Sequence, residues 1–145
     1  MKKKGFTLVE LLAVIAILAI LVIMALPAVL SMFTKARVDT FQNEVRTIYR
    51  TAQQQYLLGG GAAVTYGNNG TNCASGKVLE MTGNANLKYY ITIDGSGKVT
   101  TIQAENGTYF YSKTDANGFD IDDIDVPETP LTPSSTNKVT ACPTS

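Results

Sequence analysis

The sequence predicts an α+β fold, in which one long N-terminal helix packs on a small antiparallel sheet of three to four strands. Three observations predict it. An uncharged apolar run extends from Leu11 to Phe33, an amphipathic stretch follows it without a break, and alternating apolar segments lie between Leu87 and Lys113. The chain has 145 residues, which corresponds to about one globular domain.

The apolar run is long enough to form a transmembrane helix. About 20 apolar residues span the hydrocarbon core of a bilayer, and no charged residue interrupts Leu11–Phe33. Lys2, Lys3 and Lys4 precede the run. The positive-inside rule therefore places the N-terminus in the cytoplasm and the rest of the chain outside. We expect a membrane segment over residues 6–33.

A secretory signal peptide is the alternative, because it also begins with basic residues and an apolar stretch. The run here exceeds the apolar region of about 7–15 residues in signal peptides. The candidate cleavage sequence Leu26-Pro27-Ala28 matches the small-residue pattern poorly. Glu10 also stands at the start of the run, and a charge in a membrane helix usually marks function. These features favour the membrane helix.

Residues 34–58 have the pattern of an amphipathic helix. Apolar side chains recur at spacings of three and four residues, which places them on one helix face. They are Phe41, Val45, Ile48, Ala52 and Tyr56. The triplet Gly59–Gly61 then ends the helix, because glycine is favoured just after a helix and unfavourable inside one. One continuous helix from Phe6 to Leu58 is therefore expected.

Pro27 lies inside this predicted helix. It lacks an N–H and crowds the carbonyl group of Ile23, so a kink or a locally loosened turn is expected. A tolerated kink in a membrane helix and a functional hinge both fit the sequence.

Residues 59–145 are expected to complete a small head. The stretch 62–86 is rich in Gly and Asn and is predicted to be a loop, although Lys77–Met81 fits a short strand. Three strand patterns follow, separated by glycine-containing turns. They cover Leu87–Asp94, Lys98–Glu105 and Thr108–Lys113. These patterns predict an antiparallel meander with one face on the amphipathic helix.

The segment from Asp115 onward is acidic and then rich in Pro, Thr and Ser. Four of the five prolines lie here, so an extended tail on the surface is expected. Cys142 lies in this tail and Cys73 in the loop after the helix. Two cysteines in an exported domain favour a disulfide that would join the tail to the loop. Two free thiols are the alternative.

The composition argues against an enzyme. The chain has no His, the residue used most often for acid–base catalysis near neutral pH. Basic and acidic residues each total 12, so nucleic-acid binding is not indicated. A membrane-anchored or secreted binding module remains a second class, and it predicts no cut after Gly5 or a cut near Ala28.

The first twelve residues carry a family resemblance. The run KKGFTLVELL from Lys3 to Leu12, followed by a long apolar segment and Pro27, resembles the N-terminus of class III prepilin-like proteins. These proteins are the type IV pilins, the pseudopilins of type II secretion and the competence pilins. The resemblance covers about residues 1–58, weakens to shared architecture in the head, and implies the type IV pilin fold.

The resemblance implies a processing and assembly pathway. A prepilin peptidase would remove a leader of residues 1–5 by cutting between Gly5 and Phe6, and would methylate the new amine of Phe6. The subunit would then leave the bilayer and join a helical homo-oligomeric filament at the cell surface, with an assembly ATPase and its platform as partners. The chain most resembles a major pilin. A pseudopilin, a minor pilin and a competence pilin are the alternatives.

Glu10 is the candidate assembly residue. An ionised carboxylate among apolar helices is costly unless it is paired, and the resemblance implies the Phe6 amine of a neighbouring subunit as the partner. Buried ion pairs add little net stability but can fix register. A carboxylate that reaches the membrane interface is the alternative for Glu10. Pro27 falls where filaments of this family have a melted helix segment.

The acidic segment offers oxygen ligands suited to Ca²⁺. The candidate ligands are Asp115, Asn117, Asp120, Asp122 and Asp123. The segment faintly resembles the C-terminal calcium loop of major pseudopilins, although its spacing is not that of an EF-hand. A solvated acidic loop is the favoured alternative.

Overall fold

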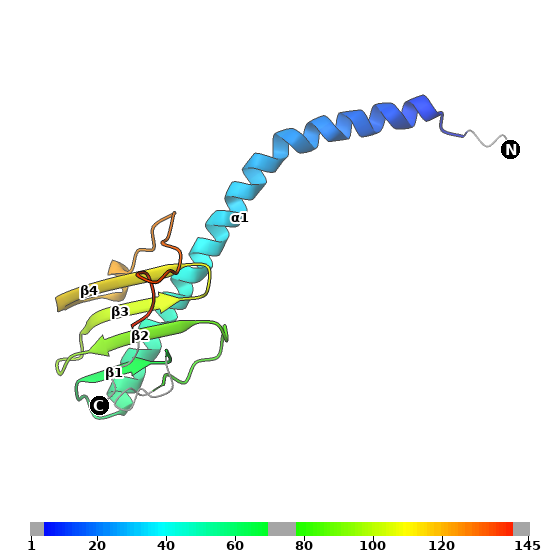
Figure 1. Ribbon diagram of the computed structural model, residues 1–145. Helices are drawn as coiled ribbons and strands as arrows, with labels where there is room; N and C mark the ends of the chain where they lie inside the picture. The colour runs from blue at the N-terminus through cyan, green and yellow to red at the C-terminus, as the bar shows by residue number, and fades with distance from the viewer. Residues whose placement is uncertain (1–4, 70–77, 141–145) are drawn as a thin grey trace. The chain divides into compact units, whose positions relative to one another are not determined.

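The computed structural model describes residues 5–69 and 78–140 and confirms the α+β class (Figure 1). One long helix precedes four strands and a short 3₁₀ helix. These elements are α1 (Leu8–Leu58), β1 (Val64–Gly67), β2 (Lys88–Ile93), β3 (Val99–Glu105), β4 (Phe110–Phe119) and η1 (Ile121–Asp123). The strands form one antiparallel sheet in the order β1-β2-β3-β4.

The chain divides into two compact units whose boundary lies inside α1, between Arg37 and Val38. In the N-terminal unit every described side chain is exposed, although most of them are apolar. The most apolar window of α1 has a mean hydropathy of 3.1, and none of it is buried. By length and composition this helix can cross a membrane.

In the second unit one face of α1 packs on the sheet. The buried side chains of this face include all five predicted apolar positions. They are Val38, Phe41, Val45, Ile48, Tyr49, Ala52 and Tyr56. The strands contribute alternate residues, such as Ile91 of β2 and Ile102 of β3, because successive side chains of a strand point to opposite faces. The helix stripe and the sheet face together form the core.

Two tyrosines of α1 bond to backbone carbonyls beyond the helix. The Tyr49 hydroxyl donates to the carbonyl of Phe119, at the end of β4, over 2.9 Å. The Tyr56 hydroxyl lies 2.7 Å from the Gly61 carbonyl and 3.2 Å from the Gly95 carbonyl, in the turn between β2 and β3. A buried tyrosine needs such a partner for its hydroxyl. These bonds attach α1 to β4 and to that turn.

The first strand differs from the prediction. β1 lies at Val64–Gly67, inside a stretch predicted to be a loop, whereas Val78–Met81, the described part of the expected strand, is not a strand. Asn68 follows β1, accepts the Tyr89 N–H through Oδ1 and donates to the Leu87 carbonyl through Nδ2. This side chain extends the pairing of β1 with β2 beyond the strand, a contact that local sequence does not reveal.

The last strand also differs from the prediction. β4 runs through Asp115–Gly118 to Phe119, a segment predicted to be irregular. Thr114 pairs with Thr101 and Phe119 pairs with Val99, so Asp115–Gly118 forms a bulge with more residues than β3 has opposite it. The strand resumes after the bulge because Phe119 is buried in the core.

The tail after η1 packs on the head without forming a further strand. Ile124, Val126 and Val139 are buried, and the Phe110 N–H donates to the Leu131 carbonyl over 2.7 Å at an isolated bridge. Apart from that bridge, the described residues after η1 have no helix or strand, which agrees with the predicted tail.

Alkaline pH is predicted to destabilise the head. Burial raises the pKa of Tyr49, Tyr89 and Tyr111, and the charges of Asp120 and Asp123 raise the pKa of Tyr49 further. The unfolded chain then loses these protons more readily, so the stability they contribute is present below about pH 10 and is lost as the pH rises above it. Thermal unfolding in detergent micelles, followed by circular dichroism, measures this. A melting temperature that does not fall as the pH rises above about 10 would contradict this prediction.

Candidate functional site

α1 begins at Leu8 rather than at the predicted Phe6, because Thr7 and Glu10 form a capping box. Glu10 Oε2 accepts hydrogen bonds from the Thr7 N–H and the Thr7 hydroxyl, each over 2.9 Å. Thr7 Oγ1 in turn accepts the Glu10 N–H over 3.3 Å. Two side chains that satisfy each other's N–H groups in this way stabilise a helix start at this position.

The peptide bond between Gly5 and Phe6 therefore lies outside the helix. The described residues before Leu8 have no regular secondary structure. The Phe6 side chain is 88% exposed, and a Cβ at Gly5 would meet no described residue within 4 Å apart from its chain neighbours. In this unit, an exposed and non-helical bond is open to attack by a protease.

Glu10 has a second carboxylate oxygen that the capping box does not use. The hydrogen bonds of Glu10 within the described residues involve Oε2 and the backbone. Thr7 thus orients the carboxylate toward the start of α1, and among the described residues Oε1 has no hydrogen-bond partner.

α1 continues through Pro27 without a break in the helix from Leu8 to Leu58. Pro27 has no N–H, so the Ile23 carbonyl lacks its usual helical donor. In the turn after Pro27, the Ser31 hydroxyl donates to the Ala28 carbonyl over 2.8 Å, a bond that competes with the backbone ladder. The kink at Pro27 stays a prediction.

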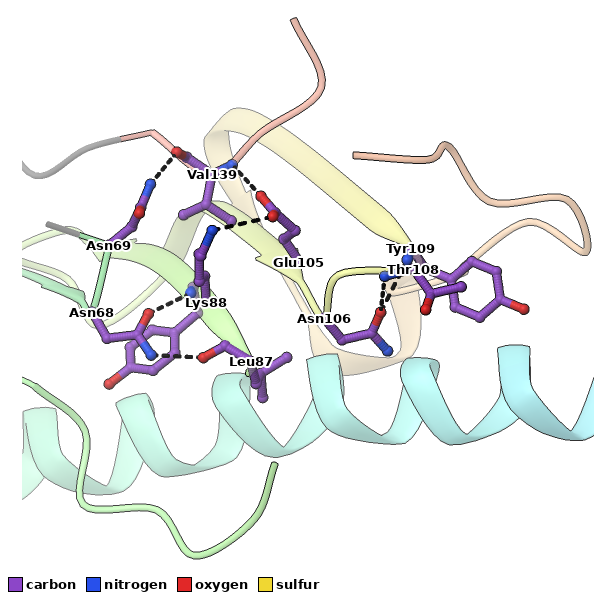
Figure 2. Close-up of polar contacts among 10 residues, drawn as sticks. Asn68, Asn69, Leu87, Lys88, Glu105, Asn106, Thr108, Tyr109 and Val139 are labelled. Carbon is purple, nitrogen blue, oxygen red and sulfur yellow. Dashed lines mark hydrogen bonds and ion pairs between the residues drawn. The ribbon is translucent and has the colours of Figure 1, made fainter. Parts of the chain in front are cut away.

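Three polar side chains hold the end of the tail against the sheet, in an arrangement that we call the C-terminal clasp. Asn69 Nδ2 donates to the Val139 carbonyl over 2.6 Å, and Glu105 Oε2 accepts the Val139 N–H over 3.4 Å (Figure 2). Gln103 Oε1 accepts the Thr140 N–H over 2.7 Å. The clasp joins β3, the segment after β1 and the tail.

Glu105 is buried, with 8% of its surface exposed. Lys88 stands directly opposite on β2, and its Nζ lies 3.4 Å from Glu105 Oε1 (Figure 2). The ion pair and the bond to the tail together make this burial tolerable. The clasp was not predicted from the sequence. Its residues meet only through strand register and tail docking, and the position of Glu105 at the end of a strand pattern was the available signal.

Cys73 and Cys142 lie outside the described residues. The clasp nevertheless brings together two described neighbours, Asn69 and Val139, which lie four and three positions before the respective cysteines.

The candidate Ca²⁺ ligands are all exposed and divide between the β4 bulge and η1 with its N-cap residue Asp120. Asp115 Oδ1 accepts the Asn117 N–H, and Asp123 Oδ2 accepts the Asp120 N–H, each over 2.9 Å. Within residues 5–69 and 78–140, no group of three or more His, Cys, Asp or Glu side chains is placed to hold a metal ion. The Ca²⁺ site, including Asp122, stays a prediction.

Comparison with known families agrees with this geometry. Residues 1–26 match the prokaryotic N-terminal methylation motif. No curated protein and no solved structure matches the chain. The motif, together with a long helix on a four-stranded antiparallel sheet, makes the chain similar to type IV pilin-like proteins of the pilin and pseudopilin class. Proteins of this class are structural and not enzymes, and they are processed at this motif as membrane precursors.

Replacing Thr7 by alanine is predicted to loosen the first turn of α1. Loss of a threonine cap costs about 1 kcal/mol, which corresponds to a roughly fivefold larger equilibrium constant for opening of the turn and to roughly fivefold faster amide exchange. Thr7→Ser keeps the hydroxyl and should behave like the wild type. Hydrogen exchange of the Glu10 amide in detergent micelles measures the difference. Equal exchange in the alanine and serine variants would show that the capping box does not hold the helix start.

Proposed function

We propose that this chain is the major subunit of a type IV pilus-like filament, cut between Gly5 and Phe6 and methylated on the Phe6 amine. The observation that supports this most is the N-terminal unit, where an apolar helix has no buried side chain. Within its own unit, no described residue covers that surface. The lipid bilayer covers it before assembly, and the helices of other copies cover it afterwards.

Cleavage would change the charge at the end of the helix. A prepilin peptidase hydrolyses the Gly5–Phe6 bond, and the absence of a side chain at Gly5 suits a narrow subsite. Residues 1–5 leave with three of the twelve basic residues of the chain. The new amine of Phe6 stays cationic when it is methylated. The processed helix then carries a positive group at Phe6 and a carboxylate at Glu10.

Assembly would pair the Glu10 carboxylate with the Phe6 amine of a neighbouring subunit. The bonds from Thr7 to Oε2 favour this pairing, because they turn the carboxylate toward the end of α1 and leave Oε1 open. In an apolar filament core the pair fixes the axial register of the subunits, while the aliphatic side chains supply the burial. An assembly ATPase and its platform supply the work of extraction. We propose that the segment of α1 that melts in the filament lies at Pro27.

A disulfide between Cys73 and Cys142 would make the C-terminal clasp covalent. The bond between Asn69 and Val139 supports this proposal because it holds the two flanking segments together. Closing a loop of about 70 residues stabilises by roughly 4 kcal/mol in the chain-entropy model.

The disulfide predicts a lower melting temperature for Cys142→Ser than for the wild type. The double variant Cys73→Ser/Cys142→Ser should melt at the temperature of the single variant, because one bond is lost in both. Thermal unfolding of the purified chains measures this, and the mass of the wild type before and after reduction and alkylation reports the bond directly. Alkylation of both thiols without reduction would contradict it.

Glu10→Ala is predicted to leave cleavage intact and to abolish fibres. The peptidase acts at Gly5–Phe6, whereas the lost carboxylate acts between subunits. Mass spectrometry of the N-terminus should find Phe6 with its added methyl group in both the wild type and the variant. Electron microscopy of material sheared from cells should find fibres only with the wild type. Normal fibre yield from Glu10→Ala would disprove the register role.

Gly5→Leu is the matched control, because it should block cleavage while leaving Glu10 unchanged. Its N-terminus should still carry the leader, and no fibres should form. A processed wild-type chain that forms no surface fibres would instead favour a pseudopilin of a type II secretion-like system. A wild-type chain that begins at Met1, or near Ala28, would overturn the proposal.

A further inference from the structure

Three Asn-Gly dipeptides occur in the chain, at Asn69, Asn106 and Asn117. In such a pair the backbone nitrogen of the glycine can attack the side-chain carbonyl carbon of the asparagine, because glycine has no Cβ to obstruct the approach. Asparagine is accordingly among the thermolabile residues. The fold decides which of these asparagines is free to react. Asn106 and Asn117 can be compared directly, since both dipeptides lie wholly within the described residues.

The side chain of Asn106 is held at both of its polar atoms. Oδ1 accepts the Thr108 N–H over 3.1 Å and the Tyr109 N–H over 2.9 Å (Figure 2). Nδ2 donates to Glu44 Oε2 on α1 over 3.2 Å. The side chain must break these bonds before its carbonyl carbon can turn to the nitrogen of Gly107. The hairpin turn therefore protects Asn106.

Asn117 has no such restraint. It lies in the β4 bulge, its side chain is exposed, and that side chain makes no hydrogen bond within the described residues. Its backbone N–H donates to Asp115 Oδ1 over 2.9 Å, which leaves the side-chain amide unengaged. The next residue, Gly118, has φ of +77°, a conformation that favours glycine. The Asn117 amide is thus exposed and directly precedes the attacking nitrogen, while the Lys98 side chain packs beside the half-buried Gly118.

We propose that Asn117 is a site of spontaneous deamidation in the folded protein, whereas Asn106 is protected. The Gly118 nitrogen, on losing its proton, forms a bond to Asn117 Cγ, and the side-chain nitrogen leaves as ammonia. Water then opens the resulting cyclic imide to aspartate or isoaspartate. One amide and one water are consumed, and one carboxylate and one ammonium ion are formed. No oxidant, metal or enzyme takes part.

The bulge accommodates the product. Isoaspartate adds one methylene group to the backbone, and Asp115–Gly118 already has more residues than β3 has opposite it. The flanking pairs Thr114–Thr101 and Phe119–Val99 therefore keep their register. The change adds a negative charge beside Asp115. This inference is independent of the proposed filament role.

The experiment uses the full chain in detergent micelles, incubated at neutral and at mildly alkaline pH. Peptide mass mapping follows the mass gain that replaces the amide by a carboxylate at each site. We expect Asn117 to react at least about tenfold faster than Asn106, because the Asn106 side chain must first release its hydrogen bonds. The Asn117 rate should rise with pH, since the attacking nitrogen must lose a proton. Asn117→Gln should remove that signal and leave the rate at Asn106 unchanged.

The unfolded chain is the control for the effect of the neighbouring residues on the deamidation rate. In concentrated urea the two dipeptides should react at similar rates, which would assign the difference to the fold. Equal rates at Asn106 and Asn117 in the folded protein would overturn the inference. A persistent preference for Asn117 in urea would also overturn it, because the structure would then not be its cause.

Discussion

The exposed apolar surface of the N-terminal half of α1 is the constraint on which the remainder of this molecule depends. Burial of apolar surface contributes about 25 cal/mol per Å², and within its own unit this half of the helix buries none of its described side chains. The head differs, because the sheet covers the apolar stripe on its part of α1. One continuous helix thus joins a self-sufficient core to a surface that needs a second environment. A membrane and a bundle of identical helices are two such environments.

Glu10 shows how a charged residue can belong to such a helix. Its Oε2 accepts hydrogen bonds from the N–H and the hydroxyl of Thr7, and its backbone N–H donates to Thr7 Oγ1. The carboxylate therefore stabilises the first turn of α1. The same hydrogen bonds fix the orientation of the Glu10 side chain. A contact with another molecule requires such a fixed orientation. Local helix capping and the proposed pairing between subunits therefore use different oxygens of one carboxylate. Glu10 can therefore cap α1 and make the proposed contact between subunits at the same time.

The predictable parts of the fold are those that local sequence determines. Helical spacing from Phe41 to Tyr56 and alternation in β2 and β3 gave the helix, its buried face and the meander. The helix start at Leu8 was also encoded, because Thr7 and Glu10 have the spacing of a capping box. β1 was missed because Asn68 pairs with residues about twenty positions away. The clasp was missed because Glu105 meets Val139 only after the sheet and the tail have docked.

The bulge in β4 has a consequence for how copies of this chain can meet. An open edge strand invites a strand of another molecule, which leads to uncontrolled aggregation. Here Leu131 bridges the start of β4, and Asp115–Gly118 interrupts its far half, so a long straight edge is not offered. β1, at the other edge, has four residues. The sheet is thereby a poor template for cross-β growth, so heads that crowd together are not expected to join through strand addition.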